Sequence, residues 1–164
     1  MPILDSRTLE FFSRSADQTR RLGIRLGGLL EKGDLVCLHG DLGSGKTTLV
    51  QGIAQGWGSL DPVSSPTFVI VNMYRRPDKL SLYHLDAYRL ESGAEAEEMD
   101  IDLMLEHGAL VVEWPERIAS ALPNSCLKVD LRWIADEQRG MVFLPQGERF
   151  ETLLADFRRK VLGG

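Results

Sequence analysis

A glycine-rich segment near the start of the chain has the residue types and spacing of a phosphate-binding loop. Residues 40–47 read Gly-Asp-Leu-Gly-Ser-Gly-Lys-Thr, with an apolar run before them and an amphipathic stretch after them. Glycines let the backbone curl so that its amide hydrogens point toward phosphate oxygens, and the start of a following helix adds positive charge. The Lys46 ammonium would reach the outer phosphates, and the Thr47 hydroxyl would be offered to magnesium. The segment therefore predicts nucleotide binding.

Two acidic residues end the strands that we expect beside this loop. Magnesium on a triphosphate needs a carboxylate, held directly or through water. Glu113 follows residues 109–112, a continuously apolar run typical of a central strand that is covered on both faces. We favour Glu113 as the magnesium partner for that reason. Asp86 ends the more polar run 82–86 and could orient the attacking water or hold a magnesium-bound water.

Hydrophobic periodicity predicts the helices around these residues. Ser15 and Gln18 have the spacing of a capping box at a helix start. Apolar residues then recur on one face up to the glycine at position 33. The predicted helices cover residues 16–31, 46–55 and 101–106, and the apolar stripe from Phe150 to Val161.

Short β-rich runs predict the strands and, with the helices, the fold. A strand over residues 35–38 precedes the loop, and residues 109–112 form a central strand. Two antiparallel pairs are expected, residues 68–74 with 80–86 and residues 127–133 with 140–144. This order predicts an α/β fold in a single domain, residues 1–164. We expect a three-layer, P-loop NTPase-like architecture in which helices flank a mixed central sheet.

Composition limits the classes of function. A chain of 164 residues with 43% hydrophobic and 26% charged residues is typical of one soluble globular domain. The formal net charge of −5 argues against a broad basic face that grips nucleic acid, so a partner would hold any nucleic acid. Cys37 and Cys126 lie in apolar runs, which predicts reduced core thiols. Neither a secretory leader nor a membrane span is expected, which favours a cytoplasmic protein.

Other residues allow two interpretations each. Thr67, in the segment 64–67, could sense the outer phosphate or could belong to a simple turn before a strand. Trp114 could stack on a base or a partner, or could only pack. The acidic run 91–102 could be a docking face or a solvated surface. His39, His84 and His107 lack the spacing of a zinc site, so we interpret them as ordinary polar side chains.

Three further segments, taken with the loop, carry a resemblance to a known family. They are Ser-Pro-Thr at 65–67, Tyr-His-Leu-Asp-Ala-Tyr-Arg-Leu at 83–90 and Val-Glu-Trp-Pro at 112–115. In this order the chain resembles the TsaE (YjeE) family over most of its length. These are bacterial P-loop ATPases that act with TsaB and TsaD in the threonylcarbamoyl modification of adenosine 37 in certain tRNAs. The resemblance implies an ATPase that is weak alone and a regulatory or reset role beside TsaD, which carries out the transfer to tRNA.

The resemblance also implies roles for individual residues. Thr47 and Glu113 would hold magnesium, and Asp86 would belong to the catalytic set with Glu113 and Lys46. Thr19 and Arg139 would lie near the nucleotide. The residues implied to bind ATP from the loop are Asp41, Leu42, Gly43, Ser44, Gly45, Lys46, Thr47 and Thr48.

Two rival functions remain open at this point. A small-molecule or nucleotide kinase also needs a phosphate loop, together with lid arginines that balance the transferred charge. Arg75 and Arg76 form an obvious arginine pair, and they fall in the expected hairpin turn. A nucleotide-dependent switch, in which ATP only orders a partner surface, is the second rival. A GTPase is disfavoured because the sequence lacks an Asn-Lys-x-Asp segment.

Overall fold

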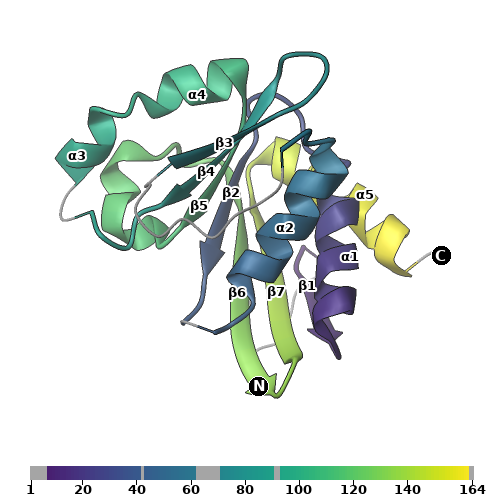
Figure 1. Cartoon of the computed structure of the whole chain (residues 1–164). Helices are drawn as coiled ribbons and strands as arrows, with labels where there is room; N and C mark the ends of the chain where they lie inside the picture. The colour runs from purple at the N-terminus through teal and green to yellow at the C-terminus, as the bar shows by residue number, and fades with distance from the viewer. Residues whose placement is uncertain (1–6, 42, 62–70, 91–92, 163–164) are drawn as a thin grey trace.

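The computed structural model describes residues 7–41, 43–61, 71–90 and 93–162 of the chain. In these ranges a seven-stranded sheet, in the order β1-β7-β6-β2-β5-β4-β3, forms the centre of the molecule (Figure 1). Its strands are β1 (Leu9–Ser13), β2 (Leu35–His39), β3 (Val71–Arg75), β4 (Ser81–Asp86), β5 (Gly108–Glu113), β6 (Cys126–Ala135) and β7 (Gln138–Gln146). The predicted α/β class with a mixed sheet is confirmed.

The middle of the sheet is parallel and its two sides are antiparallel. β2 pairs in parallel with β5 and β6, and β4 pairs in parallel with β5. The hairpins β3–β4 and β6–β7 are antiparallel, as predicted, and β1 joins antiparallel to β7. The carboxyl ends of β1, β2, β4, β5 and β6 therefore lie at one edge of the sheet, together with the start of β7. Ligands of open α/β sheets bind at such an edge.

Helices cover both faces of the sheet (Figure 1). One face packs against α1 (Ala16–Gly27), α2 (Lys46–Trp57) and α5 (Glu148–Leu162). The other packs against α3 (Gly93–Glu97), α4 (Ile101–His107) and the 3-10 helix η1 (Pro115–Ala121). The alternation within β2 shows this division, because Val36 and Leu38 join the first core while Leu35 and Cys37 join the second. The helices flank the sheet as expected.

Glycines bring α1 and α2 into close contact. A Cβ atom on Gly27 would lie 2.1 Å from the carbonyl oxygen of Ile53, and one on Gly56 would lie 2.0 Å from that of Ile24. Real Cβ contacts essentially never fall below 3.0 Å, so the two backbones approach this closely only because side chains are absent there. Both helices follow strands that end at the same edge. They therefore run in the same direction, and both begin beside the loop that joins β2 to α2.

Several boundaries differ from those that the sequence predicts. α1 ends at Gly27 rather than at residue 31, because the chain turns there: the amides of Leu29 and Leu30 bond to carbonyls only three residues back. β1, α3 and η1 have no counterpart among the predicted elements. Part of the predicted strand 68–74 lies outside the described residues. Both cysteines are free and buried, as predicted. Within the described ranges, no helix is long and apolar enough to cross a membrane.

Candidate functional site

The two predicted acids lie side by side at the carboxyl edge of the sheet. Asp86 is the register partner of Glu113 across β4 and β5, and Glu113 is also paired with Leu38 of β2. The loop starts two residues after Leu38. The topology therefore brings together the loop and both carboxylates, which are far apart in the sequence.

The loop has the backbone shape that its glycines allow. Gly43 and Gly45 have φ angles of 80° and 102°, in the left-handed region that favours glycine. Gly45 is also the N-cap of α2, where no side chain of the described residues caps the first helical turn. The amides of this turn are therefore available to an anion. The Ser44 hydroxyl is buried and has no hydrogen-bond partner among the described residues. Thr47 is exposed and Thr48 is half-buried.

Lys46 lies at the centre of the arrangement. Its side chain is buried, and Nζ donates a hydrogen bond of 2.5 Å to the carbonyl oxygen of Gly40. The same ammonium lies 4.1 Å from the ring centroid of Trp114, a cation–π distance. Burial lowers the pKa of Lys46, and the nearby carboxylates of Glu113 and Asp86 oppose this shift. The lysine is thus held between the loop carbonyl, an indole ring and two acids.

The carboxylates have different surroundings. Glu113 is 6% exposed, and its Oε2 lies 2.6 Å from Nε2 of His84, a residue that is 2% exposed. Asp86 is half-buried, and its Oδ1 accepts a hydrogen bond of 3.0 Å from the amide of Tyr88. The sequence interpretation of His84 as an ordinary polar side chain missed this contact. The strand alternation could have found it, because His84 and Asp86 are two residues apart and so lie on one face of β4.

Trp114 belongs to a small group of rings and cations beside the loop. Trp114 directly follows Glu113 in the chain, and its backbone φ of 59° is unusual for a bulky residue. The ring centroids of Trp114 and Tyr88 are 5.1 Å apart, and the guanidinium of Arg117 lies 5.5 Å from the Tyr88 ring. Trp114 therefore packs against the site and contacts Lys46 directly.

Arg139 and Thr19 lie at the same edge from the other side of the loop. A Cβ atom on Gly45 would be 3.3 Å from Cγ of Arg139, so the arginine side chain lies over the loop. Its Nη1 donates to two carbonyls of its own hairpin turn, at 2.6 and 2.9 Å. Arg139 pairs with Ser13 of β1, whose hydroxyl accepts a bond of 2.6 Å from Thr19 Oγ1. Thr19 is buried, and its hydroxyl is used within the fold.

The structure does not bring every candidate to this edge. Arg75 pairs with Asp61 at 3.3 Å, and the guanidinium of Arg76 lies 3.8 Å from the ring centroid of Trp57, the last residue of α2. Both arginines therefore lie at the end of α2 opposite to the loop. Leu42 and Thr67 lie outside the described residues, as do the first two residues of the acidic run 91–102.

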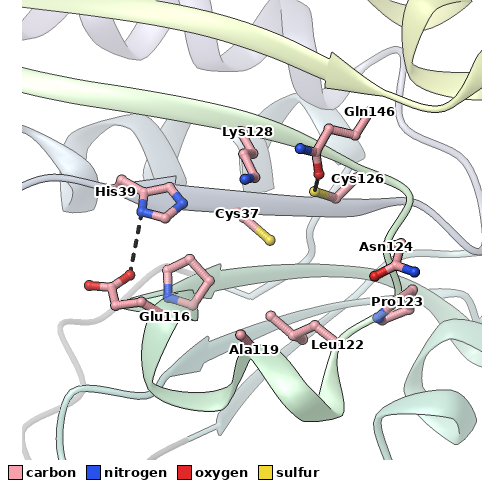
Figure 2. A pocket seen from close by; sticks show the side chains of 11 residues that line it. Cys37, His39, Glu116, Ala119, Leu122, Pro123, Asn124, Cys126, Lys128 and Gln146 are labelled. Atoms are coloured by element: carbon pink, nitrogen blue, oxygen red, sulfur yellow. Dashed lines mark hydrogen bonds and ion pairs between the residues drawn. The ribbon is translucent and has the colours of Figure 1, made fainter.

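A cavity of about 680 Å³ lies on the other face of the sheet, between the strands and η1 (Figure 2). Cys37, Cys126 and Lys128 line it, together with His39 and Glu116, which lie 3.4 Å apart. Contact with the Cys126 thiol and burial raise the pKa of Cys37. None of the predicted site residues that the structure describes lines this cavity. The candidate site is therefore the edge between loop and acids, and the cavity is a separate feature.

Comparison with known proteins gives the family. Residues 13–141 match the model of the family described as threonylcarbamoyl adenosine biosynthesis protein TsaE, and this range contains all the predicted site residues from Thr19 to Arg139. The chain belongs to the TsaE family. It is thus a protein of tRNA threonylcarbamoyladenosine biosynthesis, as the sequence resemblance implied.

Relatives of the TsaE family match the chain over most of its length. The Treponema pallidum TsaE protein is 41% identical over 128 residues, which is 77% of this chain and 93% of that protein. The Bacillus subtilis TsaE protein is 33% identical over 154 residues, which is 93% of this chain and 96% of that protein. The crystal structure of Bacillus subtilis YdiB superposes with a TM-score of 0.78 at 28% identity, covering 94% of this chain and 96% of that one.

Proposed function

We propose that this TsaE family member binds ATP with magnesium at the edge described above and hydrolyses it, in a fold of the P-loop NTPase type. The observation that carries the proposal is the convergence of the buried Lys46 with Glu113 and Asp86 beside a loop whose helix start is uncapped. A buried lysine whose pKa is lowered, next to an anion-binding backbone, is typical of phosphate chemistry.

The residues present fit a magnesium-bound triphosphate. The left-handed glycines and the unpartnered Ser44 hydroxyl leave polar groups of the loop available to phosphate oxygens. No three His, Cys, Asp or Glu side chains of the described ranges converge on one point. A divalent ion held by Glu113 would therefore take its other ligands from the Thr47 hydroxyl, phosphate and water, as magnesium commonly does.

The protein groups then divide the work. The backbone amides from Gly43 to Thr48 bind the phosphates, and the Lys46 ammonium balances charge on the outer ones. Thr47 and Glu113 hold the ion, whose chemistry when bound is to neutralise charge on the reacting phosphates. Asp86 accepts a hydrogen bond from the attacking water and orients it. Asp41 and Leu42 belong to the same ATP-binding set, as the family resemblance implies.

Two residues on the far side of the loop complete the proposed site. The side chain of Arg139 lies over Gly45, which supports a contact with the nucleotide from the β7 side. Thr19 acts indirectly, because its hydroxyl donates a hydrogen bond to Ser13, the register partner of Arg139. We therefore assign Thr19 to the support of this side of the site.

The proposed partners are TsaB and TsaD, with tRNA reached through them. The formal charge of −5 supports this division, since a basic partner would hold the tRNA. A kinase is less well supported, because Arg75 and Arg76 lie at the opposite end of α2 from the loop and are already paired with Asp61 and Asp78.

Phosphate release from ATP, measured with and without TsaB and TsaD, tests the proposal. We expect weak release by the protein alone, strong stimulation by the two partners, and loss of ATP binding in Lys46→Ala. Lys128→Ala, which changes a lysine in the cavity on the other face, is the matched control and should behave as wild type. Full activity without the partners, or transfer of phosphate to an added nucleoside or sugar, would contradict the proposal and favour the kinase.

The switch alternative needs a separate measurement. Glu113→Gln should block hydrolysis, and a reconstituted tRNA modification assay then shows whether hydrolysis is obligatory. One completed round of modification with this variant would favour a switch in which ATP only orders a partner surface. Failure of the first round would favour hydrolysis as a required step.

A further inference from the structure

We propose that His84 is a positioning residue that fixes the Glu113 carboxylate in the orientation required for the divalent ion. This inference rests on the proposed function, because it assigns a role toward the ion that accompanies ATP. His84 does not itself face the phosphates in this assignment. It acts through Glu113.

The contact between the two side chains is short and enclosed. Nε2 of His84 lies 2.6 Å from Oε2 of Glu113, and the residues are 2% and 6% exposed. Since a carboxylate only accepts hydrogen bonds, Nε2 is the donor. The bond engages Oε2, so Oε1 is the oxygen left for an ion. Neighbouring strands hold both backbones, since Asp86, two residues after His84, is the register partner of Glu113.

A fixed carboxylate is a better ligand than a free one. A glutamate side chain has several rotamers, and ordering it upon ion binding costs free energy. A hydrogen-bonded partner behind a ligand removes part of that cost and sets the direction of the free oxygen. The rigid β4–β5 pair therefore presents Glu113 in one orientation before the ion arrives.

The surroundings of His84 argue against a merely structural pair. Its register neighbour on β5 is Val111, and Leu82 lies two residues before it on the same face, both in the apolar core. Nδ1 of His84 is buried without a partner in the part of the chain that the structure describes. A buried polar pair is a poor way to stabilise such a region, where apolar side chains would pack at least as well. Sites that depart from the core pattern in this way are typically functional.

Two amide variants separate positioning from packing. In His84→Gln the side-chain amide nitrogen can reach the place of Nε2, so the donor to Glu113 is restored. In His84→Asn the amide is one carbon shorter and reaches only the place of Nδ1. His84→Leu removes the donor while matching the apolar neighbours, and serves if the asparagine variant does not fold.

The readout is ion binding rather than turnover. Mn²⁺ binding is measured by electron paramagnetic resonance in the presence of a non-hydrolysable ATP analogue, and ADP binding without divalent ions is measured by calorimetry. We expect His84→Asn and His84→Leu to weaken Mn²⁺ binding by about 10-fold or more. His84→Gln should stay close to wild type, and ADP binding without the ion should be equal in all four proteins. In a Glu113→Gln background, His84→Asn should have no further effect.

The outcomes distinguish the two proposals. Wild-type protein that binds neither the analogue nor ADP refutes the proposed function itself. If wild type binds both, the role of His84 is refuted by a folded asparagine or leucine variant with unchanged Mn²⁺ binding. It is equally refuted if His84→Gln loses as much affinity as they do, or if the loss persists when Glu113 is already replaced.

Discussion

The close contact between α1 and α2 can be tested by adding a single methyl group. In Gly56→Ala the new Cβ would lie 2.0 Å from the carbonyl oxygen of Ile24 and 2.7 Å from its carbon. These are backbone atoms, so no change of side-chain rotamer can relieve the clash. The two helices must therefore separate by about 1 Å, because real Cβ atoms essentially never lie closer than 3.0 Å to another heavy atom. Overpacking of this kind costs about 1–3 kcal/mol, and an unyielding backbone places the cost near the upper value.

The helical preference of alanine works in the opposite direction. Alanine is favoured over glycine by about 1 kcal/mol in a helix interior. The net prediction for Gly56→Ala is therefore a loss of about 2 kcal/mol in the free energy of unfolding. In urea this corresponds to a midpoint lower by about 1 M, given the slopes usual for small proteins.

Gly28→Ala is the matched control. This glycine follows α1 with a φ of −68°, and an added Cβ would find its nearest neighbours at 3.6–3.8 Å, an ordinary distance. Its midpoint should equal or exceed that of wild type, because alanine lowers the entropy of the unfolded chain. Equal urea midpoints for Gly56→Ala and Gly28→Ala would contradict this prediction.

Three further predictions concern single side chains. Burial raises the pKa of Tyr74 above its ordinary value of 10.0, so the native state holds this proton more tightly than the unfolded state does. The free energy of unfolding should therefore fall as pH rises above about 10, and urea titrations of Tyr74→Phe should show a weaker fall. Arg149→Met should lower the free energy of unfolding by about 2 kcal/mol, because it leaves the buried Asp34 carboxylate without its bidentate partner. The Arg149 side chain is 34% exposed, which keeps this loss below that of a fully buried pair, and an unchanged melting curve would refute the prediction. ATP should change the fluorescence of Trp114, because its ring centroid lies 4.1 Å from the Lys46 ammonium. An equally large fluorescence change in Trp114→Phe would show that Trp114 is not the residue that responds to ATP.

Local patterns were sufficient to predict the centre of the fold and to bring Glu113 and Asp86 to one edge of it. The glycine loop, the helix after it and the apolar strand that ends in Glu113 are each encoded within a dozen residues. The rule that parallel strands place their carboxyl ends at one edge is enough to bring Asp86 beside Glu113. The observed register bears this out.

The sequence did not predict the structural features that depend on residues far apart in the chain. β1 is a short edge strand with a charged residue inside it, and it is defined by its pairing with β7 near the other end of the chain. That pairing sets Ser13 against Arg139, so the position of Arg139 over the loop has no local signal, and only family resemblance suggested it. The end of α1 was misplaced because Leu29 and Leu30 continue the apolar periodicity into a turn.

The pairing of β1 with β7 also has a consequence for the newly made protein. β1 leaves the ribosome before the other described strands, but its partner strand follows more than 120 residues later. Contacts between such distant segments form late, because the closure of a long loop must come first. The nascent chain can build the loop, α2 and the parallel strands while Arg139 is still absent. A polypeptide stalled before β7 would accordingly carry part of the proposed nucleotide site and an unpaired strand, and such a species is prone to aggregate until β7 has been made.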